Sequence, residues 1–295
     1  MRVTDTGARL GQAGAGAARA AGGVVEGAVG EAAPWIERLA RVGYAAKAVL
    51  YATVGLLAAQ AAFGTGGGTT DTRGALRTLL DAPFGRALLA VIALGLVGYG
   101  AWRLVDAAVD PSRRGSDAKG LAKRAGIAGS GLLHLALALS AARLAARGAS
   151  ANTGGSGGGQ QALTARLLDA PGGRALVALV GAGVIGFGLY QLWRALKAKL
   201  GRDLALGELP ADTARWAVAI SRFGIAARGV VFALVGTLLL RAAASDDARQ
   251  AAGTEGALGL LATMGRWPLA IVAFGLIAYA GYELLNARYR RIRAG

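Results

Sequence analysis

Two cations lie inside long apolar runs of this sequence, at positions where a charge needs an explanation. Lys47 and Arg228 each sit about one helical turn inside the start of a run of roughly 20 apolar residues. A cation at the centre of a bilayer costs from about 2.5 to more than 10 kcal/mol, so it requires a partner or a route to the headgroups. Two interpretations stay open. Either both side chains extend back to the headgroups, or they point inward and form a cationic site.

The inward interpretation would join these two cations to the arginines that precede the first, third and fifth apolar runs. The resulting basic cluster would hold an anionic lipid headgroup or a small anion. It would consist of Lys47, Arg228, Arg41, Arg124 and Arg222.

Other polar groups inside the runs favour a structural role. Glu283 lies at a depth similar to that of Lys47 and Arg228, so we expect it to form an ion pair with one of them and to neutralise the site. His134 lies near the middle of the third run, one turn after Ser130. A neutral histidine that is hydrogen-bonded to a neighbour on its own helix is the simpler interpretation, because a proton relay would need acids at matching depth and most Asp and Glu lie in loops.

No arrangement of reactive side chains in the apolar runs is typical of an enzyme. The chain has no cysteine and one histidine, which excludes thiolate chemistry and a histidine cluster for a metal. The runs also contain no nucleophile–base pair. We therefore expect no catalytic residues, no metal and no cofactor.

The elements that carry these residues are predicted to be six transmembrane helices. Of the 295 residues, 54% are hydrophobic and 17% are charged, whereas soluble domains carry about 25% charged residues. Only helices satisfy their own backbone groups in lipid, so each run is predicted to be a helix. The runs are 44–63, 87–107, 125–146, 175–195, 223–243 and 267–287.

The basic residues between the runs predict how the chain is oriented. The net charge is +16, which in a soluble protein would indicate nucleic acid, but here Lys and Arg gather between spans, so no nucleic-acid partner is expected. The tails and the linkers on their side carry 21 Lys and Arg, against 10 in the loops on the other side. We therefore predict a plasma-membrane protein with both termini in the cytoplasm.

The two-span unit occurs three times along the chain. The motif Arg41-x-Gly43 recurs at 124–126 and 222–224, and Asp81-Ala82-Pro83-x-Gly85-Arg86 recurs at 169–174. Because each unit holds two spans, all three enter the membrane from the same side and would form a pseudo-threefold bundle. The predicted divisions are a tail at 1–34 and repeats at 35–110, 111–200 and 201–295.

Small residues lie on helix faces formed by residues three or four apart; Gly43 and Gly55, for example, share one face with Lys47 and Tyr51. Small residues at such spacings allow helix backbones to approach closely, so these faces are predicted to make the helix–helix contacts. The predicted packing glycines are Gly43, Gly55, Gly95, Gly98, Gly183, Gly186, Gly224, Gly236 and Gly275.

The repeated motifs resemble those of a known family. The motifs Arg41-x-Gly43-Tyr44, Pro83-Phe84-Gly85-Arg86 and Gly98-Tyr99 followed by Trp102-Arg103 are similar to those of the "domain of unknown function 1206" family. Its members are mainly actinobacterial membrane proteins with the unit in triplicate. The resemblance covers residues 35–290 and implies a six-span plasma-membrane protein without assigning an activity.

Two kinds of function stay open on this evidence. A structural or interaction role, or lipid binding, fits an interior that is packed by small residues. A channel or carrier for a small anion or another solute along the pseudo-threefold axis fits the repeat and the basic cluster. The expected partners are the bilayer, its anionic lipids and a membrane protein that the sequence does not identify.

Overall fold

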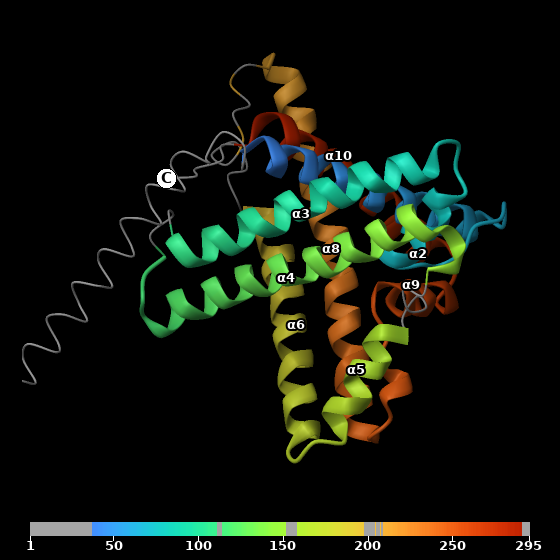
Figure 1. Ribbon diagram of the computed structural model, residues 1–295, viewed down its shortest axis with the longest axis vertical. Coiled ribbons are helices and arrows are strands. Elements are labelled where there is room, and N and C mark those ends of the chain that lie inside the picture. Colours follow the sequence, from blue (N-terminus) through green and yellow to red (C-terminus); the bar gives the residue numbers. More distant parts are fainter. Residues whose placement is uncertain are drawn as a thin grey trace, which may run out of the picture.

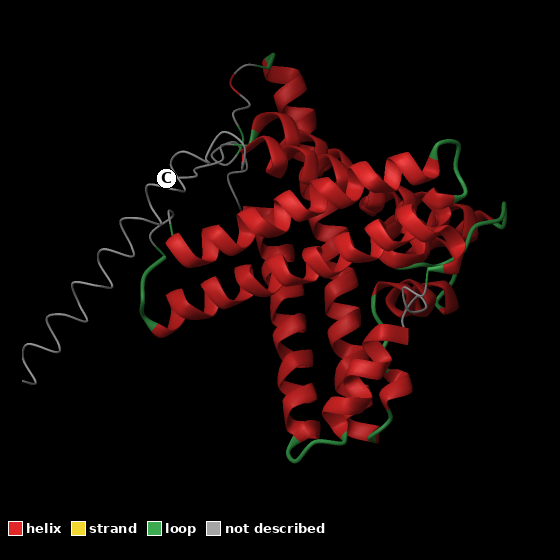
Figure 2. Cartoon of the chain, viewed as in Figure 1, coloured by secondary structure: helices red, strands yellow, loops and turns green. Residues whose placement is uncertain are grey.

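Helices account for nearly all of the described chain (Figure 2). The structure is a computed structural model that describes residues 37–110, 114–151, 158–197, 204, 207 and 209–290. The predicted tail at 1–34 lies outside these residues. Within them, the β-type pairing consists of an isolated bridge between Leu204 and Arg290.

Six of the described helices are long and apolar enough to cross a membrane, as the sequence predicts. At 1.5 Å per residue, the shortest of them, with 24 residues, spans about 36 Å and exceeds a hydrocarbon core of about 30 Å. The predicted fold class, an all-α membrane protein with six transmembrane helices, is confirmed. The spans are Glu37–Phe63, α3 (Gly85–Val109), α4 (Ala118–Arg147), α6 (Gly173–Lys197), α8 (Ala211–Ser245) and α10 (Arg266–Tyr289).

Three short helices connect the two spans of each repeat: α2 (Thr72–Leu80), α5 (Gly158–Leu168) and α9 (Thr254–Thr263). Helix α2 begins where the Asp71 carboxylate accepts hydrogen bonds from the backbone N–H groups of Arg73 and Gly74, both at 2.9 Å. Leu76 of α2 and Leu258 of α9 are fully buried. These two helices therefore cover the ends of the spans that they connect.

The six spans pack in a row. Helix α4 packs on α3, α3 on Glu37–Phe63, that helix on α10, α10 on α8 and α8 on α6. Figure 1 shows α3 beside α4 and α6 beside α8, with the two pairs crossing one another. The two spans of the middle repeat, α4 and α6, are thus the ends of the row and share few contacts.

The joints between successive repeats are built alike from glycine. Between α3 and α4, a Cβ on Gly131 would lie 3.0 Å from the carbonyl oxygen of Gly100. Between α6 and α8, a Cβ on Gly229 would lie 2.9 Å from the carbonyl oxygen of Gly188. These pairs occupy equivalent positions in their repeats, so the second span of each repeat packs on the first span of the next through the same close backbone approach.

The last repeat packs on the first in the same way. A Cβ on Gly55 would lie 2.8 Å from the carbonyl oxygen of Ala273 in α10, and a Cβ on the equivalent Gly236 would lie 2.6 Å from that of Gly181 in α6. The three joints between repeats are therefore related by the predicted pseudo-threefold symmetry. The symmetry is incomplete within the repeats, because α4 and α6 do not pack as the other two pairs do.

Helix α8 is the longest of the described helices, with 35 residues. It begins directly after Pro210, twelve residues before the predicted apolar run starts at Phe223. Its first turns project beyond the other spans at the top of Figure 1. Trp216 lies on this projecting part and is exposed.

Candidate functional site

A buried ion pair joins the first and last repeats inside the membrane. The Nζ of Lys47 donates a hydrogen bond to Oε1 of Glu283 at 2.8 Å, and the two side chains are 6% and 1% exposed. Lys47 Nζ also lies 3.4 Å from the hydroxyl of Tyr99 and 4.6 Å from the centre of its ring. Glu283 is therefore the partner of Lys47, which is one of the two pairings predicted from its depth, and the pair carries no net charge.

Arg228 occupies the equivalent position in the third repeat but has a different environment. Its Nε donates a hydrogen bond to the hydroxyl of Tyr51 at 3.1 Å, and the described residues place no carboxylate within ion-pairing distance of it. The guanidinium lies 4.5 Å from the ring centre of Phe232 and 5.0 Å from that of Tyr279, with Phe187 and Tyr51 at 5.9 and 5.8 Å. Arg228 is thus a cation held by aromatic faces, and it is partly exposed.

The middle repeat carries Ser130 and His134 where the others carry a cation and an aromatic ring. The Nδ1 of His134 lies 2.7 Å from the carbonyl oxygen of Ser130 on the preceding turn, so this nitrogen carries the proton and donates. The imidazole also packs against the Tyr99 ring, with the ring centres 4.6 Å apart. This arrangement is the one expected of a neutral histidine bonded to its own helix.

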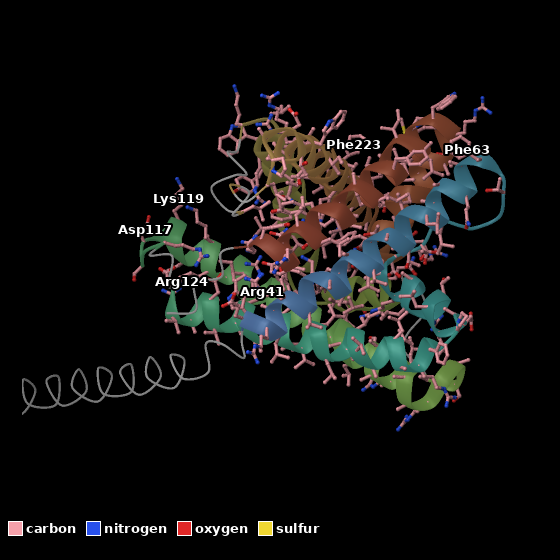
Figure 3. The ribbon with its side chains drawn as sticks, turned by 90° about the horizontal axis from the view of Figure 1, so that it is seen from above. Arg41, Phe63, Asp117, Lys119, Arg124 and Phe223 are labelled. Carbon is pink, nitrogen blue, oxygen red and sulfur yellow. The ribbon has the colours of Figure 1, made fainter. Side chains whose placement is uncertain are left out.

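Arg41 and Arg124 bind the ends of neighbouring helices. Arg41 Nη1 donates to the carbonyl oxygens of Ala287 and Arg288 at 2.9 and 2.7 Å. Arg124 donates to the carbonyl oxygens of Ala107 and Ala108 at 2.7 and 2.9 Å. Figure 3 shows both arginines toward the same end of the bundle, opposite Phe63.

These contacts change the interpretation of the basic cluster. The last carbonyls of a helix have no partner within it and carry partial negative charge, so an arginine from the antiparallel neighbour satisfies them. Lys47 is therefore paired with Glu283, Arg124 with carbonyls, and Arg41 with carbonyls and with the Glu37 carboxylate, while Arg222 is exposed on α8. Of the five predicted residues, Arg228 is the cation that lies within a predicted apolar run, 223–243, without an acidic partner in ion-pairing distance among the described residues.

At the opposite end of the bundle, Arg174 also binds the end of a neighbouring helix, and Arg86 occupies the equivalent place; the sequence did not reveal these two residues. Arg174, at the start of α6, donates to the carbonyl oxygens of Ala243 and Ala244 at the end of α8, at 3.2 and 3.1 Å. Arg86, at the start of α3, lies beside Gly148 at the end of α4. The available signal was the repeated Pro-x-Gly-Arg motif, which places an arginine at the start of a span next to the end of its antiparallel neighbour.

Most of the predicted packing glycines lie at helix contacts. Gly43 approaches Tyr99, Gly224 approaches the Tyr279 backbone and Gly275 approaches Ala227. The glycines in such contacts are Gly43, Gly55, Gly95, Gly98, Gly224, Gly236 and Gly275.

Gly183 and Gly186 in the middle repeat correct that prediction. A Cβ on either residue would meet nothing within 4 Å, and both are exposed. A Cβ on Gly126 or Gly129 of α4 would also meet nothing within 4 Å. The physical reason is that α6 turns its opposite face to α8 and α4 packs on α3, so no helix among the described residues packs on either small-residue face. We call these two faces, with Gly126 and Gly129 on α4 and Gly183 and Gly186 on α6, the open seam.

Comparisons with known proteins agree with the threefold organisation. The model of the Domain of Unknown Function (DUF1206) family matches residues 42–110, 125–198 and 223–290. "Uncharacterized protein YxxB" of Bacillus subtilis (strain 168) is 31% identical to this chain over 264 residues, which are 89% of this chain and 94% of that protein. No solved structure matches the chain. The three matched stretches coincide with the three two-span repeats and make up most of the chain, which therefore belongs to the DUF1206 family.

Proposed function

We propose that this protein is a non-enzymatic, multi-pass plasma-membrane protein that binds the phosphate of an anionic lipid headgroup at Arg228. The observation that carries the proposal is the environment of this guanidinium: it lies inside a span, close to four aromatic rings, with no acidic partner among the described residues. Contacts with aromatic faces recover only about 0.5–2 kcal/mol each, so an anion would lower the cost of the charge further.

The depth of Arg228 supports a lipid as the source of that anion. Arg228 follows Phe223, the first residue of the predicted apolar run, by five residues, which is about 7–8 Å along a helix. A phosphate drawn slightly below its usual level would reach the guanidinium at this depth. The neutral pair of Lys47 and Glu283 contributes no net charge, so the local excess of positive charge comes from Arg228.

Native mass spectrometry of the full chain with added phosphatidylglycerol tests this proposal. We expect Arg228→Ala to reduce phosphatidylglycerol retention about tenfold or more, because hydrogen bonds to charged groups contribute about 1.5–3 kcal/mol. Arg228→Lys should recover part of it, since lysine keeps the charge and loses the planar geometry. The control is Arg215→Ala, which removes an exposed arginine from the start of the same helix.

The remaining arms of the experiment separate lipid from other anions. Phosphatidylcholine should bind equally to the wild type and to Arg228→Ala. Equal retention of phosphatidylglycerol by wild type and Arg228→Ala would overturn the proposal. Displacement of phosphatidylglycerol from the wild type by millimolar inorganic phosphate would instead favour a carrier for a small anion.

The orientation belongs to the same proposal. The excess of Lys and Arg on one side supports cytoplasmic termini. Reporter fusions at both ends test this assignment, and we expect both reporters to be active only in the cytoplasm. Reporters on opposite faces of the membrane would contradict it.

A further inference from the structure

The two spans of a repeat pack closely in the first and third repeats, and not in the second. In the first repeat, Gly43 of the opening span approaches Tyr99 of α3. In the third, Gly224 of α8 approaches the backbone of Tyr279 in α10. The equivalent residues of the middle repeat are Gly126 and Phe187, and a Cβ on Gly126 would meet nothing within 4 Å.

The exposure of the aromatic ring at this position differs between the closed joints and the open one. Tyr99 is 3% exposed and Tyr279 is 4% exposed, whereas the equivalent Phe187 is 42% exposed. The three residues occupy the same position in the repeat, so the difference follows from the missing contact with α4. Packing α4 on α6 as in the other repeats would bury Phe187.

Phe187 connects the open seam to Arg228. It follows Gly183 by four residues and so shares that face of α6. Its ring packs against Phe232, with ring centres 5.1 Å apart, and lies 5.9 Å from the Arg228 guanidinium. Phe187, an exposed ring of the cation site, therefore borders the open seam.

We propose that α4 closes on α6 across the open seam and that this motion controls access to Arg228. The closed state is the joint already present twice in this chain, and the small residues that it requires are in place on both faces. Closing exchanges contacts with lipid for contacts between helices, which differ little in free energy in a membrane, so two states of similar stability follow. The control of ligand access rests on the proposed function, whereas the motion itself does not.

A pair of cysteines placed across the seam tests the motion. The chain contains no cysteine, so Gly126→Cys/Gly183→Cys introduces the two thiols without removing others. The equivalent pair in the closed first repeat is Gly43 and Gly95, where a Cβ on Gly43 would lie 2.5 Å from the Gly95 carbonyl oxygen. We expect oxidation in liposomes to give a disulfide within one chain.

Two controls and two contrary results complete this test. Gly181→Cys/Leu239→Cys lies in the closed α6–α8 joint, where the Cβ positions are 3.2 Å apart, and it should crosslink readily. Each single cysteine variant should stay monomeric on oxidation. No crosslink in the seam pair while the α6–α8 pair crosslinks would overturn the proposed motion. A crosslink between two chains would also overturn it, since a second copy would then cover the seam.

The crosslinked protein then tests access to the site. After oxidation in detergent free of phosphatidylglycerol, we expect the disulfide-locked protein to retain phosphatidylglycerol at least about tenfold less than the reduced protein, because the competent state is depleted. Reduction should restore retention. Equal retention by locked and reduced protein would overturn the control of access. If the reduced protein retains as much phosphatidylglycerol with Arg228→Ala as without it, the proposed function is overturned. The motion, which the crosslink tests by itself, would still be supported.

Discussion

Lys47 of the first repeat and Glu283 of the last are joined by a 2.8 Å hydrogen-bonded ion pair that is almost completely buried. The two residues are 236 positions apart in the sequence, so this contact links the ends of the chain across the joint between Glu37–Phe63 and α10. It adds a polar contact to a joint that otherwise consists of close packing, such as that of Gly55 on Ala273.

Removing one member of this pair should be costly. Glu283→Gln leaves the Lys47 ammonium buried without a counter-charge, and we expect the free energy of unfolding to fall by about 3–5 kcal/mol. Lys47→Met/Glu283→Gln removes both charges and should recover most of that loss. Thermal and denaturant unfolding of the full chain in one detergent measures both variants. A double variant as unstable as Glu283→Gln alone would show that the pair does not act as a charge pair.

The cap that Arg124 provides for α3 should contribute measurably to stability. Arg124→Ala leaves the carbonyls of Ala107 and Ala108 without their donor, and we expect a loss of about 1–3 kcal/mol in the free energy of unfolding. The free energy of unfolding of Arg124→Lys should lie between those of the wild type and Arg124→Ala, because a lysine cannot match the planar donor geometry of arginine. The neighbouring Lys123 is exposed, so Lys123→Ala serves as the control. Equal stability of Arg124→Ala and Lys123→Ala would contradict the cap.

Equivalent glycines should respond oppositely to alanine. A Cβ on Gly275 would collide with that of Ala227, so Gly275→Ala should destabilise the fold by about 1–3 kcal/mol. Gly183 occupies the same position in the middle repeat and has free space around it, so Gly183→Ala should be neutral or should stabilise by up to about 1 kcal/mol through helix propensity. Thermal unfolding of both variants under the same conditions compares them. Equal destabilisation would mean that α4 packs on α6 for most of the time.

The turn after α3 should depend on pH. The backbone N–H of Arg114, aided by the N–H of Gly115 and the Arg114 guanidinium, lowers the pKa of Asp110 below its ordinary value, against the opposing effect of burial. A lowered native pKa means that the unfolded chain binds more protons, so the stabilisation is complete above the ordinary value of about 3.9 and is lost as the pH falls below it.

Asp110→Asn should accordingly flatten the acid limb of the stability curve. Between about pH 5 and pH 3, the melting temperature of the wild type should fall more steeply than that of Asp110→Asn. Asp212→Asn, at a side chain that is 88% exposed, is the control and should follow the wild type. Parallel curves for Asp110→Asn and the wild type would contradict the assignment.

The spans and the repeat could be predicted from the sequence because both depend on local properties. Length and hydropathy define a membrane helix, and even the third run, which contains Ser130 and His134, forms the 30-residue α4. Glycine spacing identified faces suited to close packing at seven of nine positions. It did not show which helix packs on each face. At Gly183 and Gly186 no described residue lies within 4 Å of a Cβ, so these two glycines make no helix contact.

The functions of the arginines could not be separated in the same way. An arginine at the start of a span fits equally well in an anion site and in a cap for a neighbouring helix. The two are distinguished by distances to carbonyl oxygens that lie 17 positions away for Arg124 and 246 positions away for Arg41. Spacing within a repeat places each arginine at the start of a span, but it does not give the group that the arginine binds.

The length of α8 gives this protein a landmark on one side of the membrane. Its 35 residues extend about 52 Å, roughly 20 Å more than the hydrocarbon core needs. The surplus lies before Phe223, at the end that carries the exposed Trp216. A projecting helix of this size makes the third repeat differ from the other two when particles are viewed from the side. It can serve as a fiducial for aligning electron-microscopy images. An antibody that binds it would distinguish the two faces of the protein.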